Sequence, residues 1–439
     1  MTSPGGDSDM RTFLLLALIA ASGACGNSPD PRLIKGGGVG DGAIDGVVNV
    51  YVIDNDTYAP IADATVEVAG KQQQTDDTGL VVQGDVNGPQ TIAVKATGYR
   101  GAVWQDVNGA NVTIAVTKLG TLTAQQATLT GSIAGWDQVT VPAGHVKAGV
   151  VGYSQTDNFG DAGNSITTPN NGNTCVGNPS TCNFTIVTRT GTVTLTAAIV
   201  DLDPHGTADS SDDTYTIVGW ATAPSLQVDA GINQSGISLT QLEAGKLQNV
   251  TIDYGTPPDA LTKHDALIGI ELSKDEVVQL PVLQSGSTTA LVPTPDALAP
   301  GATYRLTAIA QTTMPDATGG PQSIVINRAL TGTSLAAPQW LTTPTNVSAT
   351  RTTASLAKVA NAKLHSVQWS DTNGIILEIT AFDTSKLTVT VPDLLALPAD
   401  GALTVKAQGI GADLDIGNFS LDTDMDLLWG ISVQPMTIN

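Results

Sequence analysis

Apolar and polar residues alternate with a period of two along most of the chain. The run at 46–54 (GVVNVYVID) shows this pattern, further strand-like runs include 147–153 (KAGVVGY) and 303–311 (TYRLTAIAQ), and Gly, Pro, Asn and Asp separate such runs. A period of two is typical of strands, because successive side chains of a strand point to opposite faces of the sheet. Turn signals recur at intervals of about 8–12 residues, as in sandwich folds. We therefore predict an all-β chain of tandem β-sandwich domains.

Composition limits the nature of the cores and the class of ligand. The chain has 439 residues, enough for roughly two to four domains of ordinary size. Hydrophobic residues make up 41% of it but aromatic residues only 4%, so the cores should consist mainly of Val, Ile and Leu. The balance of 19 Lys and Arg against 41 Asp and Glu gives a net charge of -22. Such a surface repels phosphate backbones, so we expect no nucleic-acid partner, and it can attract divalent cations.

Residues 1–24 are predicted to form a signal peptide. Arg11 supplies its basic end, 13–21 form an apolar stretch too short for a permanent membrane span, and 22–24 are small. Together with Cys25, these small residues resemble a bacterial lipobox, in which the cysteine is acylated and becomes the mature N-terminus. The resemblance implies lipidation of Cys25, a membrane partner reached through the lipid, and a place in the bacterial cell envelope as an outer-membrane or cell-surface lipoprotein. Ser22 stands where Leu is usual in that pattern, so ordinary secretion is the alternative. Residues 25–42, rich in Gly and polar residues, are predicted to be a flexible tether.

The first module is predicted over residues 43–119. Its strand-like runs carry an ordered set of landmarks: Pro60-Ile61, Ala64-Thr65-Val66, Thr75-Asp76, Gly79, Gly88-Pro89 and Gly98-Tyr99. These residues resemble the carboxypeptidase regulatory-like domain, and the resemblance implies a transthyretin-like β-sandwich that serves as a non-catalytic accessory module.

The catalytic zinc motif of a metallocarboxypeptidase is missing from the chain. Such an enzyme needs His-x-x-Glu and a distant His on zinc. None of the four histidines, at positions 145, 205, 264 and 365, has Glu three residues later. The module is therefore expected without the enzyme.

A second sandwich is predicted over residues 120–256, with a long polar loop at 156–181. Cys175 and Cys182 are the first and last residues of CVGNPSTC at the far end of this loop and are predicted to form a disulfide. That pairing leaves Cys25 unpaired, as a lipid-carrying cysteine should be. A structural role is favoured over redox chemistry, because no basic residue beside either cysteine would lower its thiol pKa.

The run DLDPHGTADSSDD at 201–213 is a candidate calcium loop. Asp201, Asp203, Asp209 and Asp212 occupy positions 1, 3, 9 and 12, and Gly206 occupies position 6, which resembles the calcium loop of EF-hands. His205 departs from that pattern, and so does the short Asp at position 12, where a Glu is usual. Strand-like runs flank the loop. Calcium is therefore the candidate cofactor, and the simpler alternative is an acidic hairpin tip that keeps the protein soluble.

Residues 257–439 are predicted to form a C-terminal region of immunoglobulin- or fibronectin-like sandwich structure. Pro257-Pro258 marks its beginning. The region is either one domain or two, and in the second case the division falls near residues 338–344.

Three short fragments occur in the order of the subtilisin-like triad. Asp77-Thr78-Gly79, His205-Gly206-Thr207 and the GTSLAAP string around Ser334 each resemble a subtilase signature. Their contexts argue against a protease, because that fold needs a parallel sheet wrapped by long helices. We expect a non-enzymatic, exported, lipid-anchored surface or periplasmic protein whose modules bind or act as spacers, with a protein or glycan ligand of unknown identity. The alternative is a secreted hydrolase with an unrecognised site.

Overall fold

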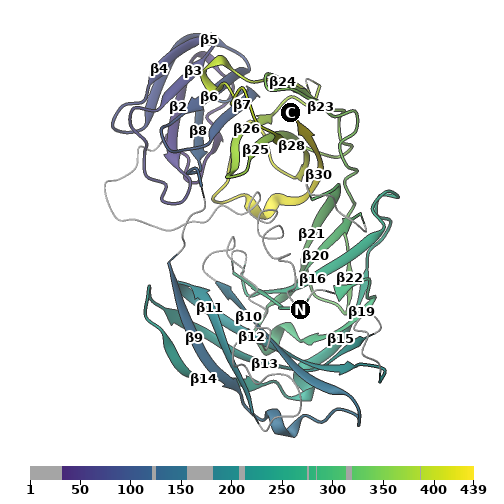
Figure 1. The fold of residues 1–439 in the computed structure, drawn as a ribbon. Coiled ribbons are helices and arrows are strands. Elements are labelled where there is room, and N and C mark those ends of the chain that lie inside the picture. The colour runs from purple at the N-terminus through teal and green to yellow at the C-terminus, as the bar shows by residue number, and fades with distance from the viewer. Residues whose placement is uncertain are drawn as a thin grey trace.

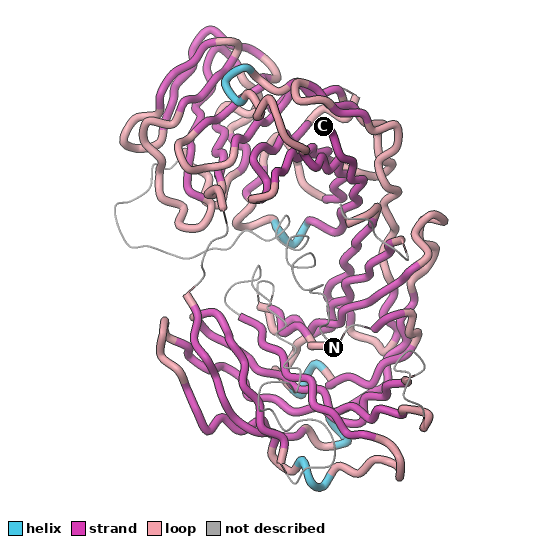
Figure 2. The backbone as a smooth tube through the Cα atoms, viewed as in Figure 1, coloured by secondary structure: helices cyan, strands magenta, loops and turns pink. Residues whose placement is uncertain are grey.

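The computed structural model describes residues 32–120, 125–155, 181–206, 213–273, 276–282, 284–312, 319–385 and 387–439. The all-β prediction is confirmed, because strands arranged in five sheets dominate these residues (Figure 1, Figure 2). The helices in the described ranges are short 3-10 turns: η1 (Trp136–Gln138), η4 (Ala244–Lys246), η5 (Pro295–Ala297), η6 (Asp393–Leu395) and η7 (Met425–Leu427). None of these described helices has the length and apolar character needed to cross a membrane.

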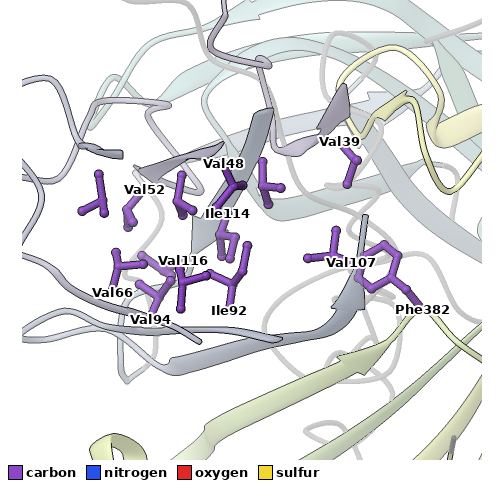
Figure 3. Packing of buried hydrophobic residues seen from close by; sticks show 14 of the residues in the cluster. Val39, Val48, Val52, Val66, Ile92, Val94, Val107, Ile114, Val116 and Phe382 are labelled. Atoms are coloured by element: carbon purple, nitrogen blue, oxygen red, sulfur yellow. The ribbon is translucent and has the colours of Figure 1, made fainter. Parts of the chain in front are cut away.

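The first sandwich packs two sheets over a valine-rich core. One sheet contains β1 (Gly38–Gly40), β2 (Asp45–Asp54), β5 (Leu80–Asn87) and β8 (Asn111–Val116). The facing strands are β3 (Thr65–Val68), β4 (Lys71–Gln74), β6 (Gln90–Lys95) and β7 (Gly101–Val107). Val48 and Val52 of β2 point at Val66, Ile92 and other apolar side chains of the facing sheet (Figure 3). The period of two thus places every second residue of β2 in the core.

The second sandwich is one six-stranded sheet that folds over its own core. One half contains β9 (Gln126–Ile133), β11 (Cys182–Arg189) and β14 (Gln234–Gln241), and the other contains β10 (Val146–Gln155), β12 (Gly191–Asp203) and β13 (Thr214–Val228). A short pairing between β13 and β14 joins the halves. Leu129, Trp136 and Phe184 pack in this core with Leu195 of the opposite half.

The third sandwich begins before the predicted boundary at residue 256. Its smaller sheet contains β15 (Leu247–Asp253), β19 (Thr289–Pro293) and β22 (Ser334–Ala336). Its larger sheet contains β16 (Lys263–Glu271), β17 (Val277–Gln279), β18 (Gln284–Ser285), β20 (Thr303–Gln311) and β21 (Gln322–Leu330). Ala198 and Trp220 of the second sandwich pack into this core, and the Trp220 Nε1–H donates to the Leu291 carbonyl oxygen at 2.8 Å. The second and third sandwiches are therefore packed directly against each other.

The fourth sandwich closes the chain. Its strands β23 (Ser348–Ala349), β24 (Thr353–Ser355) and β27 (Thr388–Thr390) form a small sheet. The facing strands are β25 (Leu364–Asp371), β26 (Gly374–Ala381), β28 (Leu403–Ala412) and β30 (Leu428–Ile438), and β29 (Phe419–Ser420) lies apart from them beside β1. Trp369, Val389 and Val405 are buried in the core between the two layers.

One sheet of 13 strands runs through the first, third and fourth sandwiches. Antiparallel pairing of β21 with β30 joins the third to the fourth, and parallel pairing of β26 with β7 joins the fourth to the first. Modules that are distant in sequence therefore share backbone hydrogen bonds, as the neighbouring labels of β7 and β26 in Figure 1 indicate.

Candidate functional site

The glycine run before the first module forms a strand. Residues 36–40 are therefore not part of a flexible tether, which corrects the prediction over 25–42 for this stretch, whereas residues 25–31 lie outside the described residues. Residues 36–40 are buried, and β1 pairs with β8 on one side and β29 on the other. A Cβ added to Gly38 would lie 2.1 Å from the Phe419 carbonyl oxygen, and one added to Gly36 would lie 2.8 Å from the Asp422 nitrogen. The glycines are needed here for close backbone approach, a role that composition alone does not distinguish from flexibility.

Aromatic side chains join the first and fourth sandwiches beside this strand. Trp104 of β7 lies 5.2 Å from Phe382 and 6.2 Å from Phe419 between ring centroids, and the two Phe rings are 6.2 Å apart. Phe382 and Phe419 are buried in the same cluster as the valines of the first module. We call this junction, made of β1, β7, β26, β29 and the three rings, the seam.

Asp54 organises the end of β2 in the first module. Its Oδ2 accepts a hydrogen bond from the Tyr99 hydroxyl at 2.7 Å and an ion pair from Lys118 at 2.9 Å. Its Oδ1 accepts the backbone N–H groups of Asp56 and Thr57, each at 2.9 Å. Burial opposes ionisation, but the donors prevail and lower the pKa of Asp54 to about 2. The carboxylate therefore holds the corner formed by Gly98 and Tyr99 in place. The sequence indicated this corner but not its hydrogen-bond partner Asp54.

A small polar pocket opens at the seam, with a volume of about 290 Å³. Arg32, Asp41, Asn111, Phe419 and Asp424 are among the residues that line it. The Asn111 amide donates to Asp41 and accepts a hydrogen bond from Asn49 at 2.7 Å. The side-chain amide of Asn111 is thus already hydrogen-bonded to Asp41 and Asn49. The pocket lies where β1 joins the first sandwich.

The second candidate site lies at the end of the β12–β13 hairpin, where strand register brings His145 to the acidic loop. β10 pairs antiparallel with β12, so Val146 lies opposite Leu202 and Lys147 opposite Asp201. Continuing that register places His145 opposite Asp203. Because side chains alternate between faces, Asp201, Asp203 and His145 share one face of the sheet.

The distances confirm this convergence. His145 Nδ1 lies 2.9 Å from Asp201 Oδ1, and His145 Nε2 lies 3.6 Å from Asp203 Oδ2. His205 Nε2 is 3.8 Å from the same Asp203 oxygen, and the His205 backbone N–H donates to Asp203 Oδ1 at 2.8 Å. Two imidazoles therefore face one carboxylate oxygen.

The structure brings together only part of the predicted calcium set. Asp201 and Asp203 are adjacent and share His145, whereas Asp209 and Asp212 lie outside the described residues. No group of three or more His, Cys, Asp or Glu side chains in the described part of the chain is positioned to hold a metal ion as it stands. The calcium loop stays a prediction. His145 was missed because it is distant in sequence, and only the β10–β12 register could have indicated it.

Of the three cysteines predicted to be covalently modified, only Cys182 lies among the described residues. Cys182 is fully buried at the start of β11, in the core of the second sandwich. Cys175 and Cys25 lie outside the described residues. The Cys175–Cys182 disulfide and the lipidation of Cys25 therefore stay predictions.

The subtilase-like fragments do not form a site. Asp77 lies in an exposed turn between β4 and β5, while Ser334 is the exposed first residue of β22 and pairs with β15. His205 follows β12 in the second sandwich. Figure 1 shows β4, β12 and β22 in separate parts of the molecule, so the three side chains are not gathered as a triad requires.

Comparison with known proteins assigns no family to this chain. No protein-family model matches the sequence, and no curated protein matches it. A Bacillus anthracis protein named TIE is similar at 11% identity and a TM-score of 0.15. The match covers 66% of this chain and only 50% of that protein. Two B repeat units of the collagen-binding protein of Staphylococcus aureus are similar at 9% identity and a TM-score of 0.16, over 76% of this chain and 74% of theirs.

The FN1–FN3 domains of chicken CNTN1 are similar at 8% identity and a TM-score of 0.14, over 74% of this chain and 90% of theirs. TM-scores this low carry no argument about function. The sheets themselves define the class, which is a protein of tandem β-sandwiches.

Proposed function

We propose that this is an exported, lipid-anchored, non-catalytic protein of the bacterial cell envelope whose sandwiches bind a partner or hold it at a distance. The observation that supports this function best is the seam. There the first module shares a sheet and a core with the fourth sandwich, although more than 250 residues separate β7 from β26 in sequence. Such a junction fixes the relative position of the two modules, which suits a spacer or a display scaffold.

The position of β1 supports a short connection to the membrane. Arg32 lies seven positions after Cys25 and lines the pocket beside β1. A fully extended chain spans at most about 3.6 Å per residue, so an acylated Cys25 would lie within about 25 Å of Arg32. The first module would then be held close to the lipid surface, and the remaining sandwiches would extend from it.

The net charge of the protein limits the class of partner that it can bind. With a net charge of -22, the protein is a poor partner for nucleic acid and a better one for a protein or a glycan. Calcium in the 201–212 loop would be a structural brace in this function.

Lipidation is tested in a bacterial host by labelling with a palmitate analogue and by membrane fractionation. The unaltered chain and a Ser22→Leu variant, which restores the usual lipobox residue, should both be labelled and found in the membrane fraction. A Cys25→Ser variant should lose the label and the membrane association. Label that persists in Cys25→Ser would exclude an anchor at this residue.

The non-catalytic part of the proposal needs a separate test. Purified protein should show no peptidase activity that depends on Ser334. A peptidase activity abolished by Ser334→Ala would show that the chain is an enzyme after all.

A further inference from the structure

The sheet of 13 strands is covered at one end and open at the other. At the covered end, β17 is buried beside the second sandwich, and the Gln279 N–H donates to the Ser154 hydroxyl of β10 at 2.7 Å. At the open end, β4 pairs only with β3 among the described strands, and all four of its residues (KQQQ) are exposed (Figure 1). We propose that β4 binds an extended, basic segment of a partner protein as an added strand, which gives the binding role proposed above, on which this inference rests, a location and a class of partner.

The hairpin geometry decides which backbone groups of β4 face the open edge. Both residues of the two-residue turn at 69–70 have positive φ, so Lys71 directly after the turn is hydrogen-bonded to β3. Directly after β4, the Thr75 N–H donates at 2.9 Å to the carbonyl oxygen of the residue before β3. Backbone groups of an antiparallel strand point alternately to its two sides. The N–H and C=O groups of Gln72 and Gln74 therefore point to the open edge, where no hydrogen bond to another described residue satisfies them.

This edge lacks the bulge and the proline that commonly protect edge strands. The register of β4 with β3 runs through four consecutive residue pairs without a shift. In the facing sheet, by contrast, the edge strand β5 is irregular, because its pairing with β2 shifts between Gly46 and Val47, and Asp85 there has a φ of 61°. A bulge bends the strand and disrupts the ladder that an added strand would extend. Of these two edges of the first sandwich, β4 is therefore the one suited to strand addition.

Side-chain hydrogen bonds hold β4 in an extended conformation before a partner arrives. The Gln73 amide donates to Gln83 Oε1 of β5 at 2.7 Å, which ties β4 to the facing sheet. The Gln72 amide donates to Glu67 Oε2 of β3 at 2.7 Å. A strand that is already ordered loses little conformational entropy on binding, so β4 is preorganised to receive a partner strand.

The charges around β4 favour a basic partner. Glu67 lies on the adjacent strand, and Asp76 and Asp77 follow β4 in an exposed turn, whereas Lys71 is the only basic residue of β4. These carboxylates attract Lys and Arg side chains of an added strand and repel acidic ones. A second copy of this chain is disfavoured, because each copy carries a net charge of -22.

Peptide titration of the detergent-solubilised exported protein, followed by NMR hydrogen exchange, tests the proposal. The probe is a peptide of about twelve alternating Thr and Lys residues, long enough to cover β4 at about 3.4 Å per residue. At saturation, the amide protons of Gln72 and Gln74 should exchange at least about tenfold more slowly, whereas that of Gln73, already bonded to β3, should change little. A peptide of alternating Thr and Glu should not bind.

Two controls separate strand pairing from attraction of a basic peptide to an acidic protein. Gln72→Pro removes an outward N–H without removing a bond to β3, and proline is tolerated on edge strands. This variant should bind the Thr–Lys peptide about tenfold more weakly, while Gln72→Thr, which keeps the N–H, should bind it as the unaltered protein does. The same peptide with every backbone nitrogen methylated keeps its charge but cannot pair as a strand, so it should not bind the unaltered protein.

Equal binding of the methylated and unmodified peptides would overturn the proposal, because charge alone would then account for the interaction. Unchanged exchange at Gln72 and Gln74, or no binding of the Thr–Lys peptide, would also overturn it. The methylated peptide is tested on the unaltered protein, so a folding defect in Gln72→Pro does not affect that comparison. Failure at β4 would leave the proposed function standing, because lipidation of Cys25 and dependence of any peptidase activity on Ser334 are measured separately.

Discussion

The seam predicts that truncation of Phe382 loosens the first module from the fourth sandwich. The Phe382 side chain is only 4% exposed, and its ring lies beside Trp104 and Phe419. Replacing a buried Phe with Ala costs about 3–5 kcal/mol, because apolar contacts are lost and a cavity remains. Since every 1.4 kcal/mol is a factor of ten, opening of the seam should become about a hundredfold to a few thousandfold more frequent.

Native-state hydrogen exchange measures this opening. In Phe382→Ala, the amides that pair β7 with β26 and β1 with β29 should exchange faster by that factor, while those of β9 and β11 should not. Phe184→Ala is the matched control, because Phe184 is equally buried but lies in the core of the second sandwich. The reasoning is refuted if Phe382→Ala accelerates exchange at the seam less than tenfold. It is also refuted if Phe184→Ala accelerates exchange there equally.

Three further predictions concern stability. In urea titrations, Gly38→Ala should lower the free energy of unfolding by about 1–3 kcal/mol, because its Cβ would lie 2.1 Å from the Phe419 carbonyl oxygen. Gly84→Ala is the control and should change it little, because a Cβ at this position meets no atom within 4 Å. Burial lowers the pKa of His365 to about 4. The unfolded chain therefore takes up a proton at this residue at higher pH than the folded protein, and about 3 kcal/mol of the free energy of unfolding should be lost as the pH falls from 6.5 to 4. An equal pH dependence in His365→Gln would contradict this. The pKa of Asp54 is lowered to about 2, so its contribution to the free energy of unfolding should persist above pH 4. About 2 kcal/mol of that free energy should be lost as the pH falls from 4 to 2. Unfolding curves of Asp54→Asn should lack that acid-induced loss.

Local pattern predicted the strands better than it predicted their grouping. The run at 46–54 became β2 with Val48, Val50 and Val52 inward, as its alternation indicated. The Pro257-Pro258 boundary, by contrast, was placed by turn residues, and β15 before it pairs with β19 and β22 after it. Turn residues mark where a strand ends, but they do not say which sheet the strand joins.

The candidate metal site shows the same limit. The sequence singled out Asp201 and Asp203 because they are close in the chain and carry carboxylates. It could not supply His145, which lies more than 50 residues earlier and arrives only through the β10–β12 register. It also treated His205 as a defect of a calcium pattern, because the neighbouring imidazole was not visible.

The sequence by itself determined that this chain is all β and built of sandwiches, because alternation with a period of two acts through each residue and its nearest neighbours. Tertiary structure alone decided that the glycine run at 36–40 is buried, that Trp104 meets Phe382, and that two histidines face Asp203. Each of these features joins segments that are distant along the chain. Their contacts depend on strand pairing across the whole molecule, and no local pattern of side chains encodes such pairing.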